Sequence, residues 1–146
     1  LKRNVYGGGG IMPDIFVPLD TTFYSEYYNR IGSRGIINKV VIQYIDQNRA
    51  VLKKKYPKFE KFNASFQTND EVLEKLKLLA EKEKIEFNSA QFETSKPLIK
   101  LQIKALIARD LWEMNEYYQV IDVENESLKK AIQILQTSGT YESLLK

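Results

Sequence analysis

The residue types that most often carry enzyme chemistry are sparse in this sequence. It contains no Cys and no His, so neither a thiol nucleophile nor a Ser-His-Asp triad can be built from it. Disulfides and Cys-ligated metal sites are excluded for the same reason. Any catalysis within these 146 residues would therefore depend on carboxylates, on tyrosine, or on a serine activated by a lysine.

Two stretches have the Ser-x-x-Lys spacing that brings both side chains to one helix face in some hydrolases. They are Ser127–Lys130 and Ser143–Lys146. A catalytic lysine must also be desolvated, because burial is what lowers its pKa into a useful range. The first stretch lies near a helix start among glutamates, and the second forms the C-terminus. We therefore predict no catalytic residue, no metal ligand and no cofactor in this chain.

Other polar residues favour structural roles. Arg109 and Asp110 interrupt an otherwise apolar stretch beside Trp112, and we expect an ion pair or hydrogen-bond network there that fixes helix register, rather than substrate contact. Tyr117 and Tyr118 could line a peptide groove, but tyrosines at helix junctions usually pack in the core with the hydroxyl tethered. No carboxylate pair, such as Glu113 with Glu116, is distinguished for acid–base chemistry.

Basic residues are densest between positions 49 and 61. One interpretation is docking to an anionic partner, such as lipid head groups, nucleic acid or an acidic protein. The other is a solvated helix C-terminus, where cations complement the helix dipole, and we favour this second interpretation. A net charge of +3 does not by itself indicate nucleic acid or membrane binding, and we predict no nucleic-acid partner. The residues are Arg49, Lys53, Lys54, Lys55, Lys58 and Lys61, against Glu60.

These side chains must be positioned by a fold that the sequence indicates to be mainly helical. The chain is long enough for one domain with a real core, and 43% of its residues are apolar. Pro97–Trp112 is apolar around most of a helical circumference, so we predict a buried central helix with the others laid against it. Lys100 and Lys104 share one face of this helix, which should reach water. No apolar run approaches the roughly 20 residues that span a bilayer.

Further helices are expected on both sides of this central element. Thr68–Glu71 fits a capping box, and Asn88 with Gln91 indicates another helix start, with Pro97 either in a first turn or at a kink. Residues 115–121 give no clear pattern, and a final helix should pack through Leu128, Ala131, Ile132 and Leu135 before Gly139 stops it. The remaining predicted helices run through residues 23–31, capped by Asp20, Thr21 or Thr22, and through 36–56, 58–66 and 123–136.

Residues 1–20 differ in kind from the rest, because they hold four consecutive glycines and two prolines. A phosphate-binding loop would need a following helix, and Pro13 with the β-like run 15–17 argues against one. A flexible linker is an alternative. The segment otherwise predicts an extended strand, a glycine loop and a second strand ahead of the helices. We therefore divide the chain at Asp20, into residues 1–20 and a helical domain of residues 21–146.

The N-terminal string RNVYGGGGIMPDI resembles the end of the catalytic core of carboxy-terminal processing (tail-specific) peptidases, whose pattern is G-R-x-I/V-x-G-x-G-I-x-P-D-V. Lys2 stands where the family often has Gly, and Ile15 where it often has Val. The helical stretch KALIARDLWEMNEYYQVI also looks like the C-terminal region of one envelope-associated branch of these peptidases. The residues that carry the match are Arg3, Val5, Gly7, Gly9, Ile11, Pro13 and Asp14.

The resemblance implies a serine endopeptidase that cleaves proteins near their C-termini through a Ser/Lys pair. That pair would lie upstream of the matched motif, so we expect this chain to be a fragment that is inactive alone. Its partners would be its own upstream peptidase domain and protein substrates, with a homodimer through residues 1–18 and membrane-surface association left open. The resemblance places it in the cell envelope, periplasmic or membrane-associated. The alternative is an independent helical adaptor that binds a partner protein.

Overall fold

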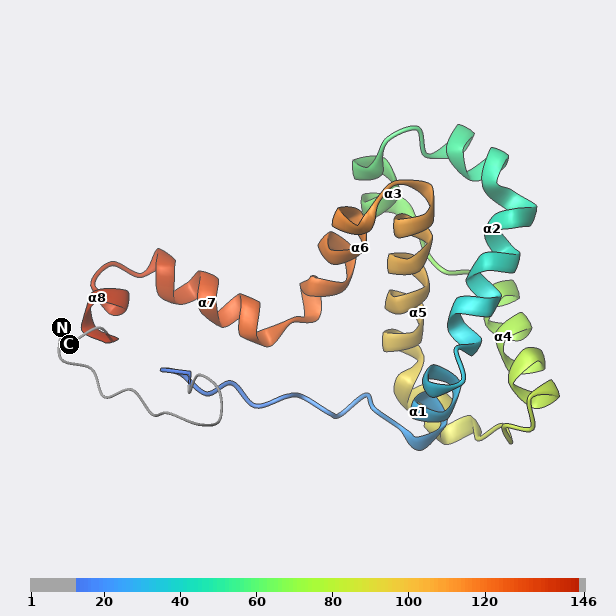
Figure 1. Ribbon diagram of the computed structural model, residues 1–146, viewed down its shortest axis with the longest axis horizontal. Coiled ribbons are helices and arrows are strands. Elements are labelled where there is room, and N and C mark those ends of the chain that lie inside the picture. The colour runs from blue at the N-terminus through green and yellow to red at the C-terminus, as the bar shows by residue number, and fades with distance from the viewer. Residues whose placement is uncertain (1–12, 145–146) are drawn as a thin grey trace, which may run out of the picture. The chain divides into compact units, whose positions relative to one another are not determined.

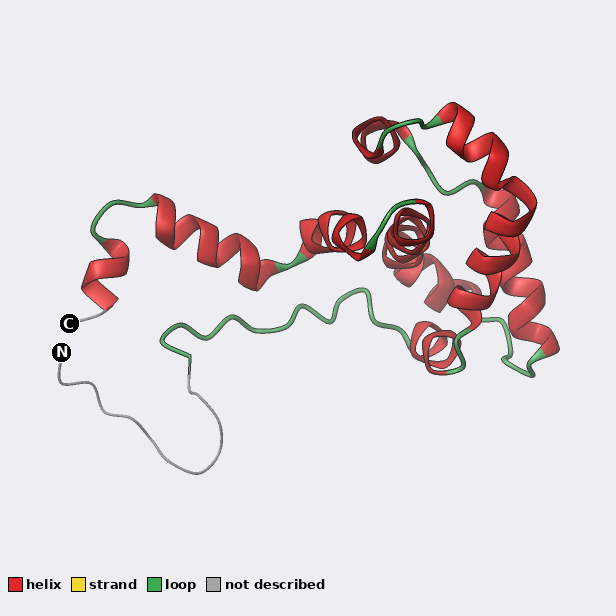
Figure 2. Cartoon of the chain, turned by 45° about the horizontal axis from the view of Figure 1, so that its top comes forward, coloured by secondary structure: helices red, strands yellow, loops and turns green. Residues whose placement is uncertain are grey.

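The computed structural model describes residues 13–144, and over this range the chain is mainly α-helical, as the sequence predicts (Figure 1). Coloured by secondary structure, the described residues show helices and loops and no strand (Figure 2). The chain divides into two units, one formed by Thr21–Val123 and the other by Leu1–Asp20 with Glu124–Lys146. We describe each unit by itself.

The larger unit is a bundle of helices with a continuous apolar core. The core takes side chains from every α-helix of the unit, and many of them, such as Ile31, Phe62 and Ile103, are completely buried. Its elements are α1 (Glu26–Ser33), α2 (Ile36–Lys55), α3 (Phe59–Ser65), α4 (Asp70–Lys82), α5 (Ser89–Leu111), α6 (Met114–Ile121) and the short 3-10 turn η1 (Asp122–Glu124).

Helix α5 is the buried central helix that the sequence predicts. Its buried residues lie on all sides, because α1, α2 and α6 each pack against it and α3 covers its C-terminal end through Phe59, Phe62 and Trp112. Helix α4 packs on α2, and its Lys77 Nζ also lies over the Phe92 ring of α5, 4.7 Å from the ring centroid. The side chains that α5 buries are Phe92, Ser95, Ile99, Ile103, Ala105, Leu106, Ile107, Ala108 and Leu111.

The prediction that this helix begins at Pro97 is corrected by its actual start at Ser89. Asn88 caps it by accepting the Gln91 backbone N–H at 3.0 Å, so Pro97 lies inside the helix. An interior proline removes one backbone hydrogen bond and costs roughly 3 kcal/mol or more in an isolated helix. Here the turns before Pro97 are anchored separately, since Phe92 is buried and Ser95 is bonded to the segment before α1.

That anchor joins the start of α1 to α5. Ser95 Oγ lies 2.6 Å from the Phe23 carbonyl oxygen and 2.8 Å from Ser25 Oγ, and it accepts the Ser25 backbone N–H at 3.2 Å. Gln91 Oε1 accepts the Tyr27 N–H at 2.8 Å. The N-cap of α1 is therefore Ser25, which accepts the Tyr28 N–H, and the predicted caps at residues 20–22 are wrong. The cap forms where α5 can hold it, three to five residues later than expected.

The start of α4 differs in detail from the sequence prediction, whereas α2 starts at Ile36 as predicted. The N-cap of α4 is Asn69, whose side chain accepts the Val72 N–H at 3.2 Å, so Thr68 is not the cap. Thr68 is buried, and its hydroxyl donates to the Lys100 carbonyl at 3.1 Å, a tertiary bond that competes with capping. Between α1 and α2, Gly35 adopts φ of 66°, a left-handed conformation that glycine accepts without strain.

The segment without a clear sequence pattern, residues 115–121, lies within α6. A capping box starts this helix, because the Glu113 side chain accepts a backbone N–H from Glu116 and the Glu116 side chain accepts the Glu113 N–H at 3.1 Å. Val120 is buried, and Tyr117 and Ile121 pack against the core. The carboxylates of Glu113 and Glu116 thus have a structural role.

The smaller unit contains α7 (Glu126–Gln136) and α8 (Thr140–Leu144). Helix α7 starts at the Asn125 cap and not at Val123, and Gly139 has φ of 76° in the turn before α8. The prediction that α7 packs through its apolar stripe is wrong for the described residues, because none of its side chains is buried. The relative exposures of Leu128, Ile132 and Leu135 are 40%, 44% and 69%.

Residues 13–20 form neither helix nor strand. The strand predicted at residues 15–17 is therefore not observed, and the strand predicted at residues 5–6 and the glycine loop lie outside the described residues. Phe16 and Leu19 are 80% and 75% exposed, so this segment presents apolar side chains that the described chain does not cover.

Candidate functional site

The Ser-x-x-Lys stretches lack the surroundings of a catalytic pair. Ser127 and Lys130 are both exposed near the start of α7, and Lys130 Nζ donates to Gln133 Oε1 at 3.1 Å. Ser143 donates its hydroxyl proton to the Thr140 carbonyl at 2.7 Å, while Lys146 lies outside the described residues. The exposed Lys130 therefore lacks the desolvated surroundings that a catalytic lysine needs.

Arg109 and Asp110 take part in a network, and a residue from α2 completes it. Arg49 donates from Nη1 to the Asp110 backbone carbonyl at 3.1 Å and from Nη2 to Asp110 Oδ1 at 3.3 Å. Arg109 Nη2 lies 3.9 Å from Asp110 Oδ2. Carbonyls in the last turn of a helix lack intrahelical partners, so the Arg49 guanidinium satisfies one of them while it joins α2 to α5. Arg49 is therefore part of this network and not of the exposed basic cluster in which the sequence places it.

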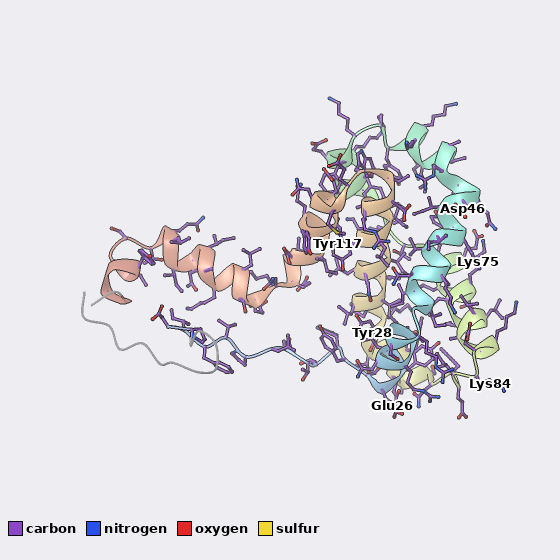
Figure 3. All side chains as sticks on the ribbon, viewed as in Figure 1. Glu26, Tyr28, Asp46, Lys75, Lys84 and Tyr117 are labelled. Carbon is purple, nitrogen blue, oxygen red and sulfur yellow. The ribbon has the colours of Figure 1, made fainter. Side chains whose placement is uncertain are left out.

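Tyrosines gather where α1, α5 and α6 meet. Tyr28 donates to Gln102 Oε1 at 2.9 Å and meets the Tyr24 ring edge-to-face, and burial together with Tyr24 and Tyr117 raises its pKa to about 12. Tyr117 packs against the core, whereas Tyr118 is 54% exposed. Figure 3 labels Tyr28 and Tyr117 on their helices. With this raised pKa the Tyr28 phenol stays protonated at neutral pH, which favours packing and hydrogen bonding over acid–base chemistry.

Lys104 does not point freely into water as its helix face predicted. Its Nζ donates to the Asn63 carbonyl of α3 at 2.6 Å, and partial burial lowers the pKa of this amine. A shallow pocket of about 260 Å³ lies beside it, lined in part by Thr68, Pro97 and Lys100. Because the ammonium already has an acceptor, Lys104 braces α3 against α5.

The lysines around the α2–α3 connection form the most distinct surface of the larger unit, and we call them the lysine patch. Lys53, Lys54 and Lys55 occupy the last turn of α2, Lys58 is the N-cap residue of α3, and Lys61 lies within α3. All five side chains are exposed, and within the described residues none of them forms an ion pair. The connection lies at one end of the bundle (Figure 1).

The lysine patch differs from several other lysines of the chain, which have acidic partners. Lys75, labelled in Figure 3, lies 2.8 Å from Glu71, and Lys77 lies 2.7 Å from Glu74. Lys96 and Lys129 also pair with glutamates on their own helices. The sequence carries a signal for this difference, since no lysine of the patch has an Asp or Glu three or four positions away.

Comparison with known proteins adds a family but no activity. A family of unknown function, DUF8443, matches residues 27–113, which is more than half of the chain. The chain belongs to the DUF8443 family. No curated protein and no solved structure matches it.

The DUF8443 match begins within α1 and ends after α5, so it contains the central helix, the Arg49–Asp110 network and the lysine patch. It leaves out residues 13–20 and helices α6 to α8. In this DUF8443 protein, no described helix is long and apolar enough to cross a bilayer. The described residues also contain no group of acidic side chains that could hold a metal ion.

Proposed function

We propose that this chain is the non-catalytic helical region that follows the catalytic core of a carboxy-terminal processing serine endopeptidase. The support is the motif resemblance of residues 3–15, which places the catalytic Ser and Lys upstream of this chain. The DUF8443 family itself has no assigned function, so it neither favours nor opposes this proposal. Within the proposal, the helical unit braces the peptidase or shapes access to it, at the cell envelope.

The observation that carries the proposal is the exposed apolar segment directly after the motif. Phe16 and Leu19 are 80% and 75% exposed, and they lie on either side of Pro18. Large exposed apolar side chains that lie close together on a short segment usually mark a surface that another chain or domain covers. The proposed cover is the sheet of the upstream peptidase core, to which this segment would contribute its last strand.

A helical adaptor remains the second candidate function, and α7 is the observation that favours it. Leu128, Ile132 and Leu135 follow a helical spacing and are exposed, as in amphipathic helices that enter an apolar groove of a partner. An adaptor of this kind would bind another protein without any connection to a peptidase.

The first experiment examines the protein that contains this chain. We expect its reading frame to encode, upstream of Leu1, a serine and a lysine within a peptidase core. The upstream region, produced separately, should bind the 146-residue chain, and Leu19→Asp should weaken that binding at least tenfold. Leu78→Asp is the matched control, because Leu78 is also exposed, at 58%, but lies on α4. A reading frame without a peptidase core, or equal effects of the two substitutions, would refute the proposal.

The second experiment tests inactivity and self-association. The isolated chain should neither cleave unfolded casein nor react with a fluorophosphonate probe. Labelling that Ser127→Ala or Ser143→Ala abolishes would overturn the proposal. Light scattering should also compare the full chain with residues 21–146. A dimer that disappears on shortening supports an exposed strand edge in residues 1–18, whereas a dimer that persists excludes it.

A further inference from the structure

We propose that the lysine patch docks the chain on an anionic lipid bilayer. The inference goes beyond the proposed peptidase role and does not rest on it, since the patch lies within the part that matches DUF8443. It starts from the distribution of charge along the sequence. Residues 53–61 carry five lysines and one glutamate, a net charge of +4, while the whole chain carries +3. The remaining residues are therefore slightly acidic, and the positive charge is local.

Helix dipoles explain only part of this local charge. Lys53, Lys54 and Lys55 lie in the last turn of α2, where cations interact favourably with the helix C-terminus. Lys58 and Lys61 lie at the start and in the first turn of α3, where the dipole favours acidic residues and disfavours cations. The first turn of α3 also carries the acidic Glu60, but the two lysines beside it lie where the dipole disfavours cations, which suggests that their charge serves a purpose outside the fold.

The chemistry of the patch suits a lipid surface better than a nucleic acid. Its charged residues are all lysines, because the neighbouring Arg49 is occupied by Asp110. Lysine provides a point charge, whereas arginine forms the bidentate contacts that recognise bases. Nucleic-acid surfaces also commonly use exposed aromatic rings for stacking, but Tyr56 and Phe59 here are only 4% and 9% exposed.

An exposed apolar residue adjoins the lysines. Val51 is 64% exposed and lies three and four positions before Lys54 and Lys55, so the three side chains share one helix face. Lysines beside an exposed aliphatic side chain are typical of surfaces that rest on the head-group layer of a membrane. Each lysine near an anionic bilayer contributes about 1 kcal/mol, which corresponds to about a fivefold change in partitioning.

The test is co-sedimentation of the 146-residue chain with vesicles of phosphatidylcholine containing roughly 30% phosphatidylserine, at about 0.1 M salt. The chain should bind these vesicles, should not bind pure phosphatidylcholine, and should be released at about 0.5 M salt. Replacing Lys54, Lys58 and Lys61 by Gln should weaken binding by roughly a hundredfold, because three lysines at about fivefold each are lost.

The matched control replaces Lys75, Lys96 and Lys129 by Gln. It changes the net charge by the same amount, but these lysines pair with glutamates. The control should bind anionic vesicles within a few-fold of the unmodified chain, and circular dichroism should show that both variants keep their helices. Equal weakening by the two variants, or no binding to anionic vesicles, would overturn the proposal. So would tighter binding to a duplex or single-stranded oligonucleotide than to the vesicles.

Discussion

The hydroxyl of Ser95 should contribute more to stability than any other single polar side chain of α5. Ser95 is completely buried, and its oxygen makes three hydrogen bonds to Phe23 and Ser25, at 2.6, 2.8 and 3.2 Å. These bonds hold the cap of α1 against the turn before Pro97. Ser95→Ala would leave the Phe23 carbonyl and the Ser25 N–H without this partner in a site that water reaches poorly.

The size of the effect follows from the number of bonds. A hydrogen bond inside a protein contributes about 0.5–1.5 kcal/mol net, so three of them contribute roughly 1.5–4.5 kcal/mol. Alanine is a better helix former than serine by about 0.5 kcal/mol, which offsets part of the loss. We therefore expect Ser95→Ala to lower the free energy of unfolding by about 1–4 kcal/mol.

Urea unfolding followed through Trp112 measures this change. The chain has a single tryptophan, and its ring packs against Phe59 and Phe62, so its fluorescence reports on the larger unit. With a slope of about 2 kcal/mol per molar urea, a loss of about 2 kcal/mol moves the midpoint down by about 1 M. The control is Thr94→Ala, because Thr94 is exposed and bonds only to the Ala90 carbonyl of its own helix.

A small difference between Ser95→Ala and Thr94→Ala would contradict the role of the Ser95 hydroxyl. Thr94→Ala should change stability by no more than about 0.5 kcal/mol, as surface substitutions usually do. If Ser95→Ala fell within about 0.5 kcal/mol of Thr94→Ala, the Ser95 network would not hold α1 on α5. The explanation for an interior Pro97 would fail with it.

Three further predictions concern the core and its tyrosines. Ile103→Ala, at a completely buried position of α5, should lower the free energy of unfolding by about 2–5 kcal/mol. Lys100→Ala should lower it by no more than about 0.5 kcal/mol. Similar losses for the two variants in urea unfolding would contradict the assignment of these residues to a buried and an exposed face of α5. Tyr27→Phe should leave stability unchanged or raise it, because the buried Tyr27 hydroxyl has no hydrogen-bond partner among the described residues. Tyr28→Phe should lower the free energy of unfolding by about 0.5–1.5 kcal/mol, because it removes the hydrogen bond to Gln102. Burial raises the pKa of both phenols to about 12, so the folded state holds these protons more tightly than the unfolded state. Stability should therefore be full below about pH 10 and fall toward pH 12. The fall should be less steep in the variant that carries both Phe substitutions.

The sequence predicts the helices of the larger unit well where periodicity is strong. The buried stripe of α2, the aromatic face of α3 and the all-round burial of α5 follow from apolar spacing alone, because burial depends on which side chains share a face. The errors lie at helix ends. The caps of α1 and α4 are displaced by Ser95 and by the Lys100 carbonyl, which are 70 and 32 residues away in the sequence. Local rules do not include such distant partners.

For the candidate sites too, the sequence predicts what depends on nearby residues and misses what depends on distant ones. Arg49 looks like one more member of a basic run until Asp110 is brought to it across 61 residues, so only the structure could remove it from the cluster. Within the part of the chain that the structure describes, the other lysines of the run form no ion pair. The sequence contains the reason, since none of them has an acidic residue three or four positions away. The apolar stripe of α7 shows the converse. Its spacing is that of a packed helix, but a pattern specifies only that a face is apolar, and not what lies against it.

The lysine patch and the segment with Phe16 and Leu19 belong to different units, and this separation makes the two proposals independent. Loss of vesicle binding on removing Lys54, Lys58 and Lys61 would leave the exposed apolar segment as it is. Loss of peptidase binding on Leu19→Asp would likewise leave the +4 charge of residues 53–61 in place. If the lysine substitutions and Leu19→Asp each weakened both vesicle binding and peptidase binding, the two surfaces would have to act together. The charge of the lysine patch would then not explain vesicle binding by itself, and the exposure of Phe16 and Leu19 would not explain peptidase binding by itself.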